Sequence, residues 1–290
     1  MHRIVGFLAS IVLFVALCAT CCACCVTNIV KPPSGPELAK MEGASTVALV
    51  HTYQGKTSPF CTGVWVSNDT ILTANHCVNA LVDELNEENN MKILQDLLNS
   101  SSVPDVMPKL SDVNPMGLTV QYIMQGESTG VEEEPSAIHI STAFALYGKK
   151  DLALLRVSNP RSIPTHGIAI LADESPAQGE AVSVMGHPIG LYWTYMTGTV
   201  AAYRDNLEGV GIDDFTGPFM QLEIPVYHGH SGGGAFNDRG ELIGIASFIL
   251  RTPDTAMFIH LDTIRAVLVG NHIIAAKLNL NPFAPDPTLE

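Results

Sequence analysis

Short apolar segments rich in β-branched and aromatic residues recur along the chain, and Gly, Pro, Asn and Asp separate them. This spacing predicts many short β-strands. The predicted strands are STVALVHTY, FCTGVWVS, TILTA, LTVQYIM, LALLRV, AVSVMG, GTVAAYR, FMQLEIPV, LIGIASFIL and AMFIHL. So many short strands with turn residues between them favour a barrel or a sandwich over alternating β/α units. No repeat with the period of a solenoid is visible.

Two stretches follow a helical period instead. Residues 78–100, VNALVDELNEENNMKILQDLLNS, place their apolar residues at the spacing of one helical face. The surrounding region from Asp83 to Glu134 holds eleven acids and two lysines. We therefore predict a helical acidic insertion over about 78–134 in a β framework. Near the C-terminus, HLDTIRAVLVGNHIIAAKL contains a cap-like Asp262 and predicts a C-terminal helix.

Residues 1–30 are predicted to be a signal or anchor segment. An uncharged run from Ile4 to Val26 is long enough for a cleaved secretion signal or a spanning helix. Cysteines at the end of this run favour lipid attachment: Cys18, Cys21, Cys22, Cys24 and Cys25. A lipid anchor, a spanning anchor, a cleaved signal and a buried apolar core segment remain open. The first three predict an extracytoplasmic protein (periplasmic, cell-surface or secreted), which we expect to be tethered to a membrane.

The chain between the termini is long enough to bury a sizeable core. Residues 31–40, KPPSGPELAK, are predicted to be an exposed linker, because prolines and glycine oppose both helix and central strand. Residues 279–290 have the same character and are predicted to be a tail, which leaves 41–278 as one domain. The net charge of −14, from 29 acids and 15 bases, argues against a nucleic-acid partner.

A serine in a glycine-rich turn, Ser231 in VYHGHSGGGAF, is the first candidate for chemistry. A hydroxyl becomes a good nucleophile when an imidazole takes its proton and a carboxylate orients that imidazole. His76 in ILTANHCV and Asp151 in GKKDLALLRV offer both groups. Each residue also has a plain structural interpretation: Ser231 as a turn residue, His76 as a packed histidine and Asp151 as a cap at the start of a strand.

A zinc site is a further alternative, formed by His228, His230 and Cys77. No known ligand spacing supports it, so we predict neither a metal nor a cofactor.

Three motifs in the order His, Asp, Ser resemble those of chymotrypsin-fold serine proteases. TANHC is similar to their TAAHC, DLALLRV to DIALLKL, and GHSGGGAF to GDSGGP. The resemblance implies an all-β fold of two packed six-stranded antiparallel β-barrels. It also implies that His76 is the general base, Asp151 its orienting carboxylate and Ser231 the nucleophile. The backbone N–H groups of Gly229 and Ser231 are then expected to form the oxyanion hole.

The same resemblance implies a disulfide between Cys61 and Cys77, which bracket the histidine strand, and two buried free thiols are the alternative. The second half is similar to bacterial HtrA-type envelope proteases, for instance GHPIGLYWTYMTGTV to GNPFGL…TVTSGIVS and RGELIGIAS to GEVIGINT. We expect a stand-alone protease domain without a PDZ module. His230 replaces the aspartate that senses a new N-terminus, so no zymogen switch is expected.

The resemblance also places the specificity pocket between the segment before the serine and a later strand. The substrate-binding residues it predicts are Pro225, Val226, Ser247, Phe248 and Ile249. These segments carry no acid to pair with Lys or Arg, so we expect cleavage after small or medium apolar residues. The expected partner is a peptide or protein substrate, and the oligomeric state stays open. The rival hypotheses are a catalytically silent domain that binds peptides or proteins, and an enzyme that hydrolyses only esters.

Overall fold

The computed structural model describes residues 32–53, 55–99, 114–127, 135–208, 212, 214–250 and 254–273. Its described residues from Ser34 onward form one compact unit. The predicted signal or anchor segment with its cysteines, and the predicted tail, lie outside the described residues. Within the described part of the chain, no helix combines the length and the apolar character that a membrane span requires.

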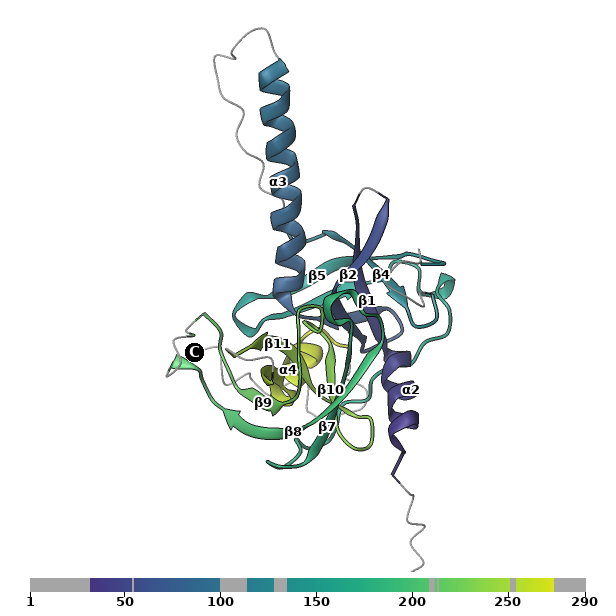
Figure 1. The fold of residues 1–290 in the computed structure, drawn as a ribbon, viewed down its shortest axis with the longest axis vertical. Coiled ribbons are helices and arrows are strands. Elements are labelled where there is room, and N and C mark those ends of the chain that lie inside the picture. The colour runs from purple at the N-terminus through teal and green to yellow at the C-terminus, as the bar shows by residue number, and fades with distance from the viewer. Residues whose placement is uncertain are drawn as a thin grey trace, which may run out of the picture. The chain divides into compact units, whose positions relative to one another are not determined.

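Two closed antiparallel barrels of six strands each make up this unit (Figure 1), which confirms the predicted fold class. The first barrel has the strand order β1-β2-β3-β6-β5-β4 and the second β10-β11-β12-β9-β8-β7. The first contains β1 (Thr46–Tyr53), β2 (Lys56–Trp65), β3 (Thr70–Thr73), β4 (Thr119–Met124), β5 (His139–Tyr147) and β6 (Leu152–Arg156). The second contains β7 (Ala181–Gly186), β8 (Thr194–Arg204), β9 (Phe219–Glu223), β10 (Gly234–Phe236), β11 (Leu242–Ile249) and β12 (Thr255–His260).

The apolar runs in the strands fill the barrels and the interface between them. One cluster fills the first barrel around Trp65 and Tyr122, whose rings meet edge to face with centroids 5.6 Å apart. A second cluster joins Leu72 and Leu154 of the first barrel to Phe236 of the second. All four residues of β3 are buried, because one of its faces lines the first barrel and the other meets the second. Continuous apolar strands therefore mark the barrel interface.

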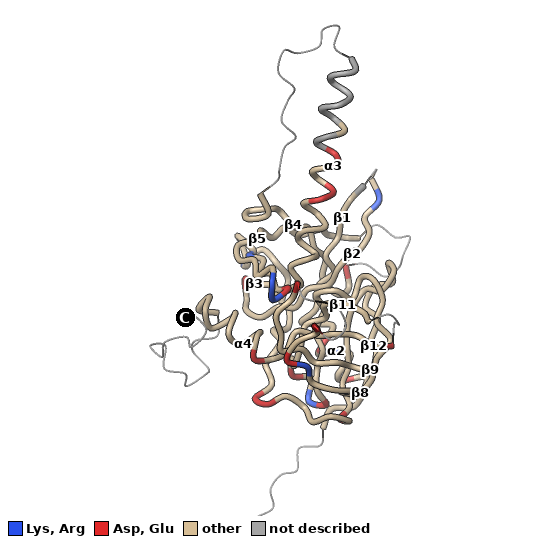
Figure 2. Tube along the Cα trace, turned by 90° about the vertical axis from the view of Figure 1, so that its left-hand side faces the viewer, with Lys and Arg blue, Asp and Glu red and all other residues tan. Residues whose placement is uncertain are grey.

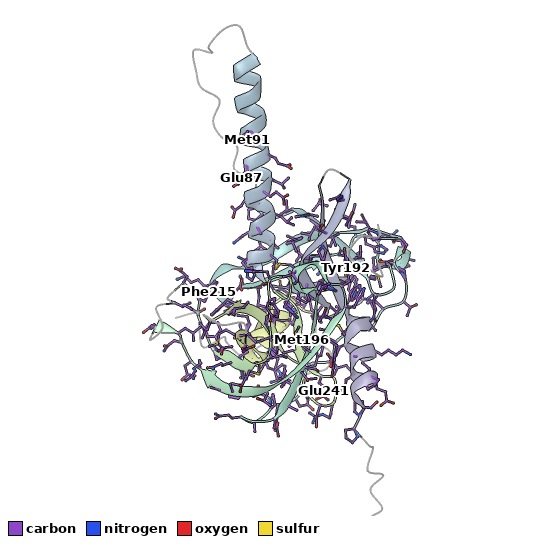
Figure 3. The ribbon with its side chains drawn as sticks, in the orientation of Figure 1. Glu87, Met91, Tyr192, Met196, Phe215 and Glu241 are labelled. Carbon is purple, nitrogen blue, oxygen red and sulfur yellow. A yellow bond between two sulfur atoms is a disulfide. The ribbon has the colours of Figure 1, made fainter. Side chains whose placement is uncertain are left out.

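The predicted acidic insertion begins as a long helix. Helix α3 (Asn75–Asn99) projects from the first barrel and carries exposed acids (Figures 1 and 2), and Glu87 and Met91 lie on its exposed part (Figure 3). The predicted range of about 78–134 overlaps the predicted strand LTVQYIM, and the structure confirms the strand: Thr119–Met124 form β4 between β1 and β5, so the insertion does not extend through them. The segment is an apolar strand that is buried at Val120 and from Tyr122 to Met124, so its own apolar residues and not the surrounding acids indicate its structure.

The predicted linker also needs correction, because a helix, α2 (Gly35–Ser45), begins within it. Ser34 stands at the N-cap, and its backbone N and its Oγ both donate to Glu37 Oε2 at 2.7 Å. Pro36 lies in the first turn, where a helix needs no N–H donor. The proline that was expected to oppose a helix is therefore compatible with its start.

The predicted C-terminal helix is present as α4 (Leu261–Gly270). Its N-cap is His260 rather than Asp262, because His260 Nδ1 accepts a hydrogen bond from the Asp262 backbone N at 3.2 Å. Three 3-10 turns complete the elements: η1 (Gly148–Lys150), η2 (Pro160–Ser162) and η3 (Pro188–Gly190).

Helix α2 is joined to the second barrel through a buried carboxyl group. The side chain of Glu42 accepts a hydrogen bond from Ser183 Oγ of β7 at 2.5 Å. Its other oxygen has no partner among the described residues, and the residue is 1% exposed. Burial raises the pKa of Glu42 to about 7, against an ordinary value of 4.5, and the Ser183 hydrogen bond offsets only part of this shift.

Glu42→Gln is expected to remove a pH dependence of stability. The folded protein holds the Glu42 proton up to a pH of about 7, whereas the unfolded chain releases it near 4.5. The stability from the protonated carboxyl is therefore lost as the pH rises through this window. Relative to Glu42→Gln, wild type should lose about 2 to 3 kcal/mol of unfolding free energy between pH 5 and pH 8. Urea unfolding at both pH values measures this loss. The control Glu174→Gln alters an exposed residue, so its unfolding free energy should depend on pH as that of wild type does. If the unfolding free energies of wild type and Glu42→Gln depended on pH in the same way, the raised pKa of Glu42 would be refuted.

Candidate active site

The turn that carries Ser231 requires its glycines. Gly229 has φ +102°, and a Cβ there would lie 2.2 Å from the carbonyl oxygen of His187. Gly232 has φ +80°, and a Cβ there would lie 2.1 Å from Thr73 Oγ1. Only glycine combines this backbone conformation with so close an approach of neighbouring chain. The turn is also held from the first barrel, because the backbone N of Thr62 donates to the carbonyl of Ser231 at 2.8 Å.

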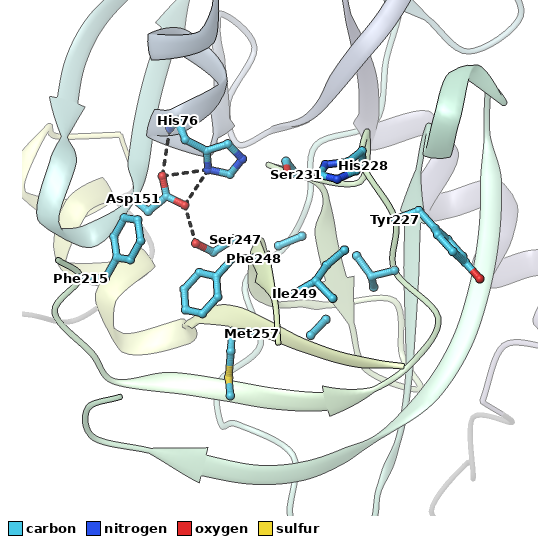
Figure 4. Close-up of a pocket in the computed structure, with 13 residues that line it drawn as sticks. His76, Asp151, Phe215, Tyr227, His228, Ser231, Ser247, Phe248, Ile249 and Met257 are labelled. Carbon is cyan, nitrogen blue, oxygen red and sulfur yellow. Dashed lines mark hydrogen bonds and ion pairs between the residues drawn. The ribbon is translucent and has the colours of Figure 1, made fainter. Parts of the chain in front are cut away.

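His76 and Asp151 form a hydrogen-bonded pair (Figure 4). The ring Nδ1 of His76 lies 2.9 Å from Asp151 Oδ2 and 3.1 Å from Oδ1, and the His76 backbone N donates to Oδ1 at 2.9 Å. Ser247 Oγ donates to Oδ2. Because the carboxylate only accepts, Nδ1 carries the proton and Nε2 is left as an acceptor. The side chain of His76 is 40% exposed and that of Asp151 only 2%, so the imidazole is accessible and its partner is not.

Local structure explains both positions. His76 is the second residue of α3, directly after β3. Asp151 ends η1 with φ +48°, in the left-handed region that aspartate tolerates better than most residues. A disulfide joins Cys61 of β2 to Cys77 of α3 with an S–S distance of 1.99 Å. It therefore links the first turn of α3 to the barrel next to His76.

Two backbone amides at the turn have no acceptor. Among the described residues, the N–H groups of Gly229 and Ser231 donate no hydrogen bond, whereas the amide of His230 between them donates to the Tyr227 carbonyl at 3.1 Å. The His228 carbonyl accepts from the backbone N of Ile189 at 2.8 Å. That bond fixes the orientation of the peptide that bears the Gly229 N–H. Two unpaired donors beside a serine can bind a negatively charged oxygen.

The segment that holds the His228 carbonyl is itself strained and rests on buried histidines. Ile189 has φ +45°, which is rare for a β-branched residue. His187 is fully buried, accepts a hydrogen bond from the Trp193 backbone N at 3.1 Å, and has its pKa lowered to about 3 by burial. Burial also lowers the pKa of His230. Both rings are therefore neutral at neutral pH.

In the alternative zinc site of His228, His230 and Cys77, the sulfur of Cys77 is in the disulfide. The one group with metal-ligand proximity in the described part of the chain is Cys61, His76 and Cys77. Both sulfurs of that group are bonded to each other.

A pocket of about 590 Å³ contains His76, Asp151 and Ser231 in its wall (Figure 4). Four predicted substrate-binding residues line it: Val226, Ser247, Phe248 and Ile249. Pro225 does not; it is exposed, and the alternation of the segment turns the buried Val226 toward the pocket instead. The other lining residues are Phe215, Tyr227, His228, Ala246, Ala256 and Met257. Tyr227, His228 and Ala246 lie in the two segments that the sequence predicts to wall the pocket, whereas Phe215, Ala256 and Met257 come from outside them.

Strand pairing explains part of what the sequence missed. In the register of β11 and β12, Phe248 stands opposite Met257 and Ile249 opposite Ala256. Residues on β12 therefore reach the pocket as cross-strand neighbours of residues on β11. Ala246 belongs to the β11 segment that the sequence predicts to wall the pocket, together with Ser247, Phe248 and Ile249. Phe215 comes from the segment before β9, and its ring stacks on Phe248 with centroids 5.5 Å apart.

A second serine–histidine–aspartate set lies outside this pocket. Ser175 Oγ is 3.0 Å from His260 Nε2, and His260 Nδ1 is 3.4 Å from Asp262 Oδ2. The backbone N of Asp262 donates to Nδ1, so the ring proton is on Nε2. A protonated Nε2 donates to the serine and cannot take its proton. This set caps α4 and differs in tautomer from the pair of His76 and Asp151.

Comparison with known families decides the affiliation. The family model of the trypsin-like peptidase domain matches residues 61–245. This chain belongs to that family. The match begins at Cys61 and ends in β11, so it includes all three residues of the predicted triad.

Curated relatives of this trypsin-like peptidase domain are HtrA-type proteases. The serine protease HTRA1B of Danio rerio is 31% identical over 129 residues, which are 44% of this chain and 26% of that protein. The periplasmic pH-dependent serine endoprotease DegQ of Escherichia coli strain K12 is 35% identical over 103 residues, 35% of this chain and 21% of that protein. The resemblance predicted from the motifs is confirmed. The chain spans about a quarter of the length of these relatives.

Solved structures support the fold. The active form of the Rv3671c protease from M. tuberculosis has a TM-score of 0.55 at 16% identity, over 88% of this chain and 90% of that one. The HtrA-type protease AlgW with a tripeptide has a TM-score of 0.55 at 18% identity, over 84% of this chain and 64% of that one. Identities this low support the two-barrel architecture alone.

Gly229→Ala should remove one oxyanion donor from this peptidase domain. The added Cβ meets the His187 carbonyl, so the turn must rearrange and the Gly229 N–H must move. We expect kcat for peptide hydrolysis to fall about 100- to 1,000-fold while the protein stays folded. Gly179→Ala is the matched control, because Gly179 has φ +91° with nothing within 4 Å of an added Cβ. It should keep wild-type kcat. Equal kcat values for the two variants would contradict this role of the turn.

Proposed function

We propose that this chain is a serine endopeptidase that hydrolyses peptide bonds through an acyl-enzyme. The observation that carries the proposal is the pair of His76 and Asp151 in one pocket with Ser231, whose turn offers two unpaired amides. Membership in the trypsin-like peptidase domain family supports it. Curated relatives that are named as serine proteases support it as well.

The proposed reaction follows from the tautomer. Ser231 Oγ attacks the peptide carbonyl carbon while His76 Nε2 takes the hydroxyl proton, and Asp151 stabilises the imidazolium that forms. The N–H groups of Gly229 and Ser231 bind the oxyanion. His76 then gives the proton to the leaving nitrogen, the C–N bond breaks, and an ester to Ser231 remains. Water, deprotonated by His76, hydrolyses that ester and restores the serine hydroxyl.

The walls of the pocket favour a small or medium aliphatic side chain before the cleaved bond. Ile249 and Ala256 stand opposite each other on β11 and β12 and narrow the pocket. Among the described residues of its wall, the one carboxylate, Asp151, is already paired with His76 and Ser247. A Lys or Arg side chain would therefore be buried without a counter-charge, which costs several kcal/mol. Val, Ala and Leu fit these walls without such a cost.

We further propose an extracytoplasmic location, which the periplasmic DegQ and DegP among the relatives support. Residues 1–30 are proposed to tether the domain to a membrane, through a spanning segment or a lipidated cysteine. We propose that no N-terminal cleavage activates the enzyme. His230 is fully buried and its Nδ1 lies 3.2 Å from the Tyr227 backbone N and O, so it has no exposed charge with which to sense a new amino group.

Ser231→Ala and His76→Ala test the triad. Each should lower kcat by about 10⁵- to 10⁶-fold, and the double variant should be no worse, because the residues act as one unit. Hydrolysis of a quenched fluorescent peptide gives these rates. Ser231→Ala activity within tenfold of wild type would end the triad assignment.

Labelling with a fluorophosphonate separates the enzyme from the silent binding domain. Wild type should be labelled at Ser231 and Ser231→Ala should not. A wild-type chain that binds peptides but stays unlabelled at every pH would support the binding domain. A labelled chain that cleaves esters and no peptides would support the esterase.

Ile249→Gly tests the specificity pocket. Removal of the side chain opposite Ala256 widens the pocket, so the preference should move from Val and Ala toward Phe and Tyr, with a change in relative kcat/KM of about tenfold or more. A peptide library read by mass spectrometry measures it. The exposed Ile140→Gly is the control and should keep the wild-type profile. Wild-type cleavage mainly after Lys, Arg or Glu would refute the pocket assignment and leave the triad untouched.

A further inference from the structure

A second groove, of about 610 Å³, lies between α3 and the first barrel, on β1 and the segment before β4. We call it the α3 groove. Its apolar surface includes Leu81 and Leu85 of α3 and Met116, which is 48% exposed. Its charged groups are Glu84 and Glu88. Leu81 and Leu85 are partly buried against the core of the first barrel, so the groove combines partly exposed apolar side chains with negative charge.

The two glutamates are an unfavourable pair for the helix alone. Glu84 and Glu88 are four residues apart, so they share one face, and like charges at this spacing destabilise a helix. No Lys or Arg lines the described groove. His51 Nδ1 is 3.5 Å from Glu84 Oε2, and this ring is the nearest basic group in the wall. The negative potential of the groove is thus largely uncompensated by the chain.

The α3 groove is close to the catalytic pocket along a rigid element. Leu81 and Glu88 follow His76 by five and twelve residues on the same helix. At a rise of about 1.5 Å per residue, the groove extends from about 8 to about 18 Å beyond His76. An extended polypeptide covers that distance with about six residues. A substrate bound at Ser231 can therefore reach the groove with a nearby segment.

We propose that the α3 groove binds a segment of the polypeptide substrate that carries Lys or Arg beside apolar residues. That this segment belongs to a substrate rests on the proposed endopeptidase function, whereas the binding of such a segment to the groove does not. A second copy of this chain fits poorly, because its net charge of −14 repels the groove. Anionic lipid is repelled for the same reason. The cation is recognised at Glu84 and Glu88, and the apolar residues at Leu81, Leu85 and Met116.

Direct binding tests the groove without catalysis. The full chain with Ser231→Ala is titrated with three fluorescent peptides that share Leu residues and differ only in Lys, Gln or Glu. The Lys peptide should bind best. Glu84→Gln with Glu88→Gln should weaken it about three- to tenfold, because each exposed charge pair contributes modestly. Asp83→Asn with Glu87→Gln removes the same charge from exposed positions of α3 outside the groove and should change the affinity less than twofold.

A kinetic test of the groove uses the chain with the wild-type Ser231. Substrates with one cleaved sequence are compared with and without a Lys/Leu extension on either side. The extension should raise kcat/KM in wild type and in the Asp83/Glu87 variant, and its benefit should shrink in the Glu84/Glu88 variant. If the benefit of the extension shrank equally in the two variants, and 1 M salt abolished both losses, the effect would come from the long-range electrostatic field of the helix. That result would refute the proposed binding in the groove. Equal binding of the Lys and Gln peptides would overturn it as well.

The remaining outcomes separate this proposal from the protease assignment. Binding of the Lys peptide with the expected variant pattern, but without cleavage of any substrate, refutes the endopeptidase and leaves the groove. Efficient cleavage with no binding of the Lys peptide refutes the groove and leaves the endopeptidase. A dimer in sedimentation that Glu84→Gln with Glu88→Gln dissociates would assign the groove to a second copy and overturn the proposal.

Discussion

The buried carboxylate of Asp151 is the group on which the site depends. It accepts hydrogen bonds from the backbone and ring of His76 and from Ser247 Oγ. Its side chain is 2% exposed, so the negative charge is stable only with such donors around it. His76 lies in the first turn of the helix on the first barrel, and Ser247 belongs to β11 of the second. One carboxylate therefore sets the tautomer of the imidazole and joins the two barrels at the cleft.

Each barrel donates a hydrogen bond to a site residue of the other barrel. Asp151 of the first barrel is held by Ser247 of the second, and Ser231 of the second is held by the Thr62 amide of the first. The loop before β9 adds a further link, because the Thr216 backbone N donates to the Lys149 carbonyl at 2.7 Å, two residues before Asp151. These bonds form only when both barrels are folded and packed. The site thus depends on the interface, because Asp151 and Ser231 each take at least one hydrogen bond from the opposite barrel, and Asp151 takes this bond in addition to those from His76 of its own.

The sequence predicts those parts of the structure that depend on residues close together along the chain. The strands follow from alternating apolar and polar residues and from short apolar runs. His76, Asp151 and Ser231 each stand in a short motif whose conformation depends on a single turn or strand end. Helix α2 was missed because Pro36 was counted against a helix, although the first turn accepts it. The apolar run LTVQYIM predicts strand β4 correctly, and only the range given to the acidic insertion is wrong there, because acidic residues flank the strand on both sides. The pocket residues on β12 depend on strand register, which no local pattern contains.

Helix α3 connects these levels of structure. Its first turn is fixed by the Asp151 bond to the His76 amide and by the Cys61–Cys77 disulfide, so its direction is set by the same contacts that set the imidazole. A helix of 25 residues is stiff over its length, unlike a loop inserted at the same place. Residues that extend from it, such as Glu84, therefore keep a fixed distance from Ser231. An insertion that begins next to His76 places new surface beside the cleft without altering the barrel strands, because it is anchored at its first turns, by the Asp151 bond, the disulfide and the packing of Val78 and Leu81 on the first barrel.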